Sequence, residues 1–107
     1  MIPDNIKQEI DDISKQIIEK YKPQKIILFG SAALGDFTPD SDIDFFIIKE
    51  NVPYLGRDRC RELSKLIERD VAVDFIVYKP DEFNKWYKLG DPFLKTIINK
   101  GKVLYES

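Results

Sequence analysis

The sequence contains no histidine and only one cysteine, Cys60. The absence of histidine removes the commonest general base, the usual catalytic triads and most transition-metal sites. A single cysteine cannot form a disulfide within the chain, and it cannot anchor a structural zinc ion by itself. Any chemistry must therefore depend on carboxylates and on hard cations, which bind oxygen ligands.

An excess of basic residues is also missing. The 17 Lys and Arg are balanced by 19 Asp and Glu, which gives a formal net charge of −2. Dedicated nucleic-acid-binding domains carry a basic patch, so we expect no direct binding of DNA or RNA. The sequence shows neither a membrane-length apolar stretch nor the apolar centre of a signal peptide. We therefore expect a cytoplasmic protein with no membrane partner.

The length of 107 residues predicts one domain spanning residues 1–107. Hydrophobic periodicity and the positions of Pro and Gly predict the order αβαβαβααβ, a mixed α/β (α+β) fold. The expected segments are helix 4–21, strand 25–30, a helical turn 31–34, strand 43–50, helix 57–70, strand 71–79, helices 81–90 and 91–101, and strand 102–106.

Some details within these segments are also predicted. Asp4 and Ser31 are the expected N-caps of their helices. Helix 57–70 is expected to bury one face, formed by Cys60, Leu63, Leu66 and Ile67. The aromatic residues of the C-terminal helices favour a core role over a partner surface, although both remain open; they are Phe83, Trp86, Tyr87 and Phe93.

Two aspartates, Asp42 and Asp44, stand one residue apart where the apolar segment 43–50 begins. Because side chains alternate along a strand, both carboxylates should lie on one face, with their Cα atoms roughly 6–7 Å apart. Like charges this close to each other, next to apolar side chains, raise the cost of ionisation. A bound divalent cation removes that cost, and Mg²⁺ selects oxygen ligands.

A third carboxylate, Asp74, is the only charged residue in the apolar run VAVDFIVY. Burying an isolated carboxylate in such a strand is expensive unless it is paired or bound to a metal. If the strands that carry Asp44 and Asp74 are neighbours, the three acids converge at one end of the sheet. Such a group would suit one or two hard cations.

Simpler interpretations of these acids remain. A lone Asp-x-Asp near a turn is usually a solvated cap. Asp74 taken alone fits an ion pair with Lys25 or with an arginine of helix 57–70. A calcium loop beginning at Asp40 is excluded, because its sixth position is Phe45 instead of Gly and its twelfth is Asn51 instead of Glu.

The dipeptide Gly30-Ser31 follows the apolar run KIILF and precedes the helical turn 31–34. Glycine lets the backbone approach a ligand and accepts a positive φ. The N–H groups that follow, with the Ser31 hydroxyl, could bind an anion. Taken alone, the dipeptide is better explained as a turn with an N-cap, and no P-loop motif is present.

Gly30-Ser31, the pair Asp42 and Asp44, and the later Asp74 together resemble the motif of the nucleotidyltransferase superfamily that includes DNA polymerase beta. The length and the N-terminal helix look like the minimal nucleotidyltransferase (MNT) subgroup. Members of this subgroup are often encoded beside a HEPN-domain protein and act as its antitoxin. The resemblance implies a nucleotidyltransferase fold, a mostly antiparallel mixed sheet flanked by helices.

The resemblance also implies roles for the motif residues. Gly30 and Ser31 would hold the triphosphate of a nucleoside triphosphate, expected to be ATP. Asp42 and Asp44 would bind two Mg²⁺ ions, and Asp74 would complete the first metal site and help activate the attacking hydroxyl. The expected reaction moves AMP to a hydroxyl of a partner protein, a HEPN toxin. The oligomeric state, the acceptor residue and the base preference do not follow from these motifs.

One position departs from the subgroup. Its usual pattern is Gly-Ser-x-Ala-Arg-Gly, and this sequence has Leu34 in place of the arginine. Arginine can bind phosphate through two hydrogen bonds, whereas leucine cannot. Leu34 therefore favours an alternative function, in which the fold neutralises its partner by contact alone.

Overall fold

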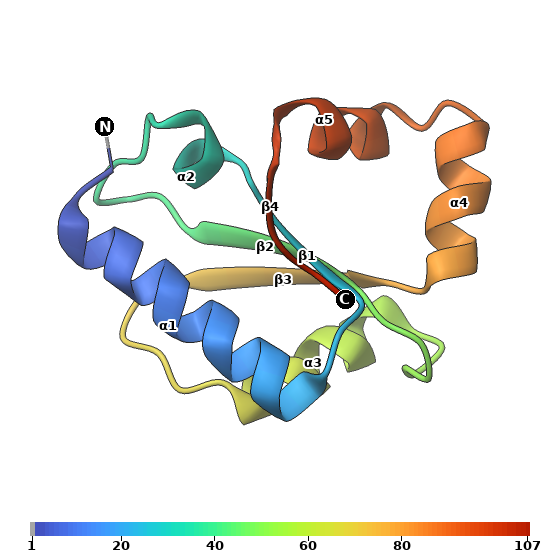
Figure 1. Ribbon diagram of the computed structural model, residues 1–107, viewed down its shortest axis with the longest axis horizontal. Helices are drawn as coiled ribbons and strands as arrows, with labels where there is room; N and C mark the ends of the chain where they lie inside the picture. Colours follow the sequence, from blue (N-terminus) through green and yellow to red (C-terminus); the bar gives the residue numbers. More distant parts are fainter. Residues whose placement is uncertain (1) are drawn as a thin grey trace.

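The computed structural model describes residues 2–107 as a four-stranded sheet with helices on both faces (Figure 1). The expected order of elements is confirmed. The elements are α1 (Asp4–Tyr21), β1 (Lys25–Phe29), α2 (Ser31–Leu34), β2 (Ile43–Ile48), α3 (Gly56–Leu66), β3 (Val73–Tyr78), α4 (Pro80–Lys88), α5 (Pro92–Lys100) and β4 (Lys102–Glu106).

The strands lie in the order β3-β2-β1-β4. β1 is antiparallel to both β2 and β4, whereas β2 and β3 are parallel and are joined through α3. The mostly antiparallel mixed sheet implied by the resemblance is thus confirmed. The parallel pair matters most here, because it brings β3 beside the strand that carries Asp44.

Two separate groups of buried side chains hold the helices on the sheet. Ile43 and Phe45 of β2 belong to the core shared with α1 and α3. Phe46, on the opposite face, is fully buried in a smaller core with Leu94 and Ile97 of α5. Figure 1 shows α1 and α3 on one side of the sheet and α4 and α5 on the other. β2 is apolar throughout its second half because both of its faces are covered.

The predicted caps are wrong by one residue. Pro3 occupies the N-cap position of α1, so Asp4 is the first helical residue and its side chain makes no capping hydrogen bond. A carboxylate in this first turn is still favourable, because the helix N-terminus is partly positive. Gly30, not Ser31, is the N-cap residue of α2.

The third helix is shorter than predicted. α3 ends at Leu66, and Ile67 already has an extended backbone with φ −104° and ψ 120°. Ile67 is buried from that extended segment, whereas Leu66 is 38% exposed and does not belong to the buried face. The strand after it begins at Val73 rather than at residue 71.

The expected core role of the C-terminal aromatics holds only in part. Phe83 and Tyr87 stack with ring centroids 5.6 Å apart and pack against the smaller core. Trp86 is 47% exposed and belongs to the surface, whereas Phe93 is 39% exposed but packs edge-on against Phe29 and the buried Phe46.

A buried arginine ties several elements together. Arg59 of α3 is 4% exposed, and its guanidinium donates to the carbonyls of Pro53 (2.6 Å), Tyr54 (3.1 Å) and Val77 (3.1 Å). It also donates to both carboxylate oxygens of Glu82 in α4, at 2.7 and 3.2 Å. These bonds lower the pKa of Glu82. One side chain therefore joins α3, the loop before it, β3 and α4.

We expect Arg59→Met to reduce the free energy of unfolding by about 3 kcal/mol, because it removes the ion pair with Glu82 and leaves three carbonyl oxygens without the guanidinium donor. Arg61→Met, at an exposed position of the same helix, is the matched control and should change stability by less than about 0.5 kcal/mol. Urea unfolding of both variants measures the difference. Equal effects would show that the Arg59 network does not stabilise the fold.

Candidate active site

The parallel pairing of β2 and β3 places Asp44 directly beside Asp74, because their Cα atoms are partners in the register. On its other side Asp44 is paired with Phe29, the last residue of β1. Asp42 lies two residues before Asp44, just outside β2. The prediction that the two acidic strands are neighbours is therefore confirmed, and the Gly30-Ser31 turn lies at the same end of the sheet because it follows Phe29.

The apolar run around Asp74 predicted a buried carboxylate that needs a partner or a metal ion, and this prediction is wrong. β3 is an edge strand, and Asp74 is exposed. Its side chain does not need a partner to compensate for burial. The ion-pair alternative also finds no support, since the two salt bridges found among residues 2–107 join Lys25 to Glu106 and Arg59 to Glu82. Asp44, in the interior strand β2, is the partly buried acid of the three.

The surroundings of Asp44 raise its pKa. Partial burial, together with the negative charges of Asp74 and Asp42, raises the pKa of Asp44 to about 6. Burial is the larger cause, followed by Asp74 and then Asp42. The folded protein therefore holds a carboxylate at a point where negative charge is unfavourable and where a cation would be favoured.

Gly30 closes the site from the β1 side. Its backbone has φ 72° and ψ −154°, and a Cβ atom built on it would collide with Oδ2 of Asp44. The carbonyl of Gly30 accepts hydrogen bonds from the N–H groups of Ala33 and Leu34, both at 3.1 Å, which start α2. Glycine is therefore required here both for the backbone conformation and for the close approach of the carboxylate.

The three carboxylates do not form a ready-made ligand cluster. Among residues 2–107, no group of three acidic or cysteine side chains is arranged so that it could hold a metal ion. Asp44 nevertheless lies within electrostatic range of both Asp74 and Asp42.

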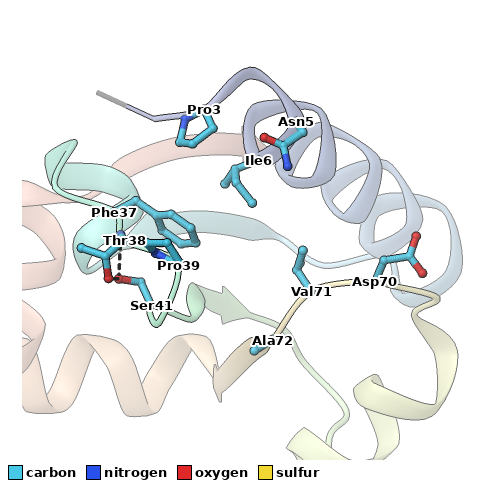
Figure 2. A pocket seen from close by; sticks show the side chains of 10 residues that line it. All are labelled: Pro3, Asn5, Ile6, Phe37, Thr38, Pro39, Ser41, Asp70, Val71 and Ala72. Atoms are coloured by element: carbon cyan, nitrogen blue, oxygen red, sulfur yellow. Dashed lines mark hydrogen bonds between the residues drawn. The ribbon is translucent and has the colours of Figure 1, made fainter.

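A cavity of about 420 Å³ opens at the same end of the sheet, between the start of α1 and the segments 37–41 and 70–72. Figure 2 shows Ile6 pointing from α1 toward Phe37 and Pro39 of the segment 37–41. Thr38 and Ser41 close this loop, with their hydroxyl oxygens 3.1 Å apart. The turn-rich sequence 35–41 predicts a loop here but gives no sign of the cavity, which depends on contacts with α1.

Comparison with known proteins decides the family. The model of the nucleotidyltransferase domain family matches residues 10–105, nearly the whole chain. The chain belongs to the nucleotidyltransferase domain family. The match includes Gly30, Ser31 and all three aspartates, and it confirms the resemblance drawn from these residues.

Curated relatives of this nucleotidyltransferase come from Methanocaldococcus jannaschii. "Putative protein adenylyltransferase MJ0604" is 36% identical over 103 residues, which cover 94% of this chain and 99% of the relative. "Putative protein adenylyltransferase MJ1379" is 30% identical over 97 residues, with 89% of each chain covered. These likenesses extend over full-length relatives and support the same enzyme class, a nucleotidyltransferase.

Solved structures support the fold. A crystal structure described as a putative nucleotidyltransferase from Sulfolobus solfataricus superposes with a TM-score of 0.63 and 21% identity, covering 99% of this chain and 90% of that one. A structure described as a toxin-antitoxin with AMP-PNP superposes with a TM-score of 0.60 and 21% identity, covering 91% and 73%. Within residues 2–107 of the nucleotidyltransferase, no helix is long and apolar enough to cross a membrane.

The collision at Gly30 can be separated from backbone strain by a matched pair of variants. Gly35 also has a positive φ, 85°, but a Cβ atom there meets no heavy atom within 4 Å. We expect Gly35→Ala to cost about 1 kcal/mol from strain alone, and Gly30→Ala to cost roughly 1–3 kcal/mol more, because its methyl group displaces Asp44. Denaturant unfolding measures both, and equal losses would contradict the close approach.

The raised pKa of Asp44 predicts a pH-dependent effect of removing its charge. In the folded protein this pKa is about 6, above its ordinary value of 3.8, so the charge of Asp44 destabilises the fold as the pH rises from about 4 through about 6. We therefore expect Asp44→Asn to match the wild type near pH 4. At pH 7.5 in metal-free buffer it should be more stable by about 1 kcal/mol, a value discounted for partial solvation.

Thermal unfolding in the presence of EDTA measures this difference. Asp36→Asn, at an exposed position in the adjoining loop, is the control and should change stability by less than about 0.5 kcal/mol at either pH. A destabilised Asp44→Asn variant at pH 7.5, or an advantage that is equally large at pH 4, would contradict the electrostatic origin.

Proposed function

We propose that this nucleotidyltransferase transfers AMP from ATP to a hydroxyl group of a partner protein, a HEPN-domain toxin, and thereby acts as an antitoxin. The observation that carries the proposal is the alignment of Asp44 with Asp74 in neighbouring strands, directly against Gly30. The names of the curated relatives support protein adenylylation. The name of the second structural neighbour supports a toxin–antitoxin setting and a nucleotide substrate.

The residues at the site suit Mg²⁺. All three proposed ligands, Asp42, Asp44 and Asp74, are carboxylates, which is the ligand type that this ion prefers. The raised pKa of Asp44 marks the place where a positive charge would be most favourable. When bound, two Mg²⁺ ions would stabilise the attacking and leaving oxygens of the displacement.

The chain's own residues orient the reactants. Gly30 and Ser31 would hold the triphosphate, with the Ser31 hydroxyl as a donor and with Gly30 keeping this turn directly against Asp44. Asp74 is exposed on the edge strand, where a hydroxyl of another protein can reach it and where it would help to activate that oxygen. The acceptor oxygen would then bond to the α-phosphorus, its proton would pass to the Asp74 carboxylate, and the bond to the leaving pyrophosphate would break.

Leu34 supports a second candidate function. Its side chain is 58% exposed in α2, directly after Gly30 and Ser31, and it offers no hydrogen bond to a phosphate. A domain with weakened nucleotide binding could still neutralise a toxin by covering it. In that function the carboxylates would be dispensable, and only the contact surface would matter.

The transfer reaction is tested with labelled ATP, Mg²⁺ and the protein encoded by the adjacent gene. We expect the label to appear on that partner, and Asp44→Ala to reduce the rate at least about 100-fold because the nucleotide site loses its central carboxylate. Asp36→Ala is the matched control and should transfer label at the wild-type rate. Transfer by Asp44→Ala at the wild-type rate, or no label with any of the proteins, would overturn the proposal.

Growth rescue distinguishes the two candidate functions. A variant with alanine at positions 42, 44 and 74 should fail to protect cells that express the toxin if modification is required. Protection equal to that of the wild type would show that contact is sufficient.

A further inference from the structure

Among residues 2–107, no strand pairs with the outer edge of β3, because β3 ends the strand order. The carbonyls of Ala72 and Tyr78 accept hydrogen bonds from Ile43 and Lys49 of the β2 chain segment, so these positions face β2. Backbone groups alternate in direction along a strand. The backbone N–H and C=O groups of Val73, Phe75 and Val77 therefore face outward.

A cavity of about 430 Å³ follows this edge. It is lined by residues 75–78 of β3, by Tyr54 and Trp86, and by Arg59 and Glu82, which are hydrogen-bonded to each other at 2.7 Å. Tyr54 is 88% exposed and Trp86 is 47% exposed. We name this cavity the edge groove.

The chemistry of the edge groove specifies its occupant. Outward-facing N–H and C=O groups recur at every second residue of this edge, about 7 Å apart, which matches the backbone of an extended peptide. The exposed aromatic rings of Tyr54 and Trp86 provide apolar contacts for the side chains of such a peptide. Strand addition of this kind obtains its affinity from the main chain and its specificity from the adjoining pockets.

The edge leads to the candidate active site. Val73 is the first residue of β3 and the neighbour of Asp74, whose side chain is exposed. We propose that an extended segment of the partner protein adds as a strand to the outer edge of β3 and so brings its acceptor hydroxyl to Asp74. This inference rests on the proposed function, because it identifies how the acceptor of that reaction is bound.

Arg59 limits where the added strand can pair. Its guanidinium already donates to the outward carbonyl of Val77 at 3.1 Å and is fixed by Glu82 at 2.7 Å. The outward carbonyls of Val73 and Phe75 are the acceptors nearer to Asp74. The added strand therefore pairs most fully through Val73 and Phe75, at the end of β3 that carries the acids, and its continuation beyond Phe75 lies in the edge groove, where side-chain contacts replace strand pairing. The buried charge of Arg59 also limits uncontrolled pairing of this edge with other chains.

Residue-resolved amide exchange tests the inference on the complex with the partner encoded by the adjacent gene. In the free protein, the amides of Val73, Phe75 and Val77 should exchange quickly, and in the complex they should exchange at least about tenfold more slowly. The amides of Asp74 and Ile76 face β2 and should be slow in both states. Unchanged exchange of the outward amides in a formed complex would overturn the inference.

Two variant pairs provide independent readouts. Val73→Pro and Val73→Ala both shorten the side chain, but only proline removes the outward N–H, at the first residue of a strand where proline is tolerated. Val73→Pro should bind the partner about tenfold more weakly than Val73→Ala.

Trp86→Ala should weaken binding, whereas Leu89→Ala should not, since Leu89 is 69% exposed but does not line the groove. Equal affinities within both pairs would contradict strand addition.

The outcomes separate this inference from the proposed function. Label transfer without protection of the outward amides would reject strand addition and leave the transfer reaction in place. Protection of the outward amides without label transfer would reject the transfer reaction and leave strand addition in place. The absence of any complex would reject strand addition and the transfer reaction together. Protection of the same amides in the free protein at high concentration would show that the occupant is a second copy of this chain, which also overturns the inference.

Discussion

Three features of its surroundings disfavour the negative charge of Asp44. It is partly buried in β2, it lies beside Asp74 in the next strand, and Asp42 precedes it by two residues. The glycine of the neighbouring turn leaves room for this carboxylate, because a Cβ atom at Gly30 would collide with Oδ2 of Asp44. The charged form of Asp44 is unfavourable in the free protein, and a bound cation would balance that charge. This conflict between stability and charge is the physical basis of the proposed metal site.

Packing and hydrogen bonds elsewhere in the fold compensate for the unfavourable charge of Asp44. β2 carries Asp44 at its beginning and is buried on both faces from Phe45 to Ile48, so the strand is fixed by packing on either side. At the opposite end of β3, Arg59 joins α3 and α4 through hydrogen bonds to Val77 and Glu82. The acids therefore lie at the end of a rigid pair of strands, which suits a site that must hold two substrates in register.

Sequence patterns were sufficient for the order of elements, the three acids and the turn, because apolar runs and Asp-x-Asp spacing are local signals. They failed where tertiary context decides. The run around Asp74 looks like a buried strand, but β3 is at the edge of the sheet and only one of its faces is fully covered. Helix α3 ends at Leu66 because Ile67 turns its side chain into the core from an extended segment. The edge groove was not predicted, since it is formed by segments distant in sequence.

The most direct test of the central claim is a carbon-13 NMR titration of the side-chain carboxyl groups, with and without Mg²⁺. The account predicts that Asp44 titrates near pH 6 in metal-free buffer. With saturating Mg²⁺, its midpoint should fall below the ordinary value for aspartate, because the cation favours the charged form. A midpoint near pH 4 without metal, or a raised midpoint that Mg²⁺ does not lower, would contradict it.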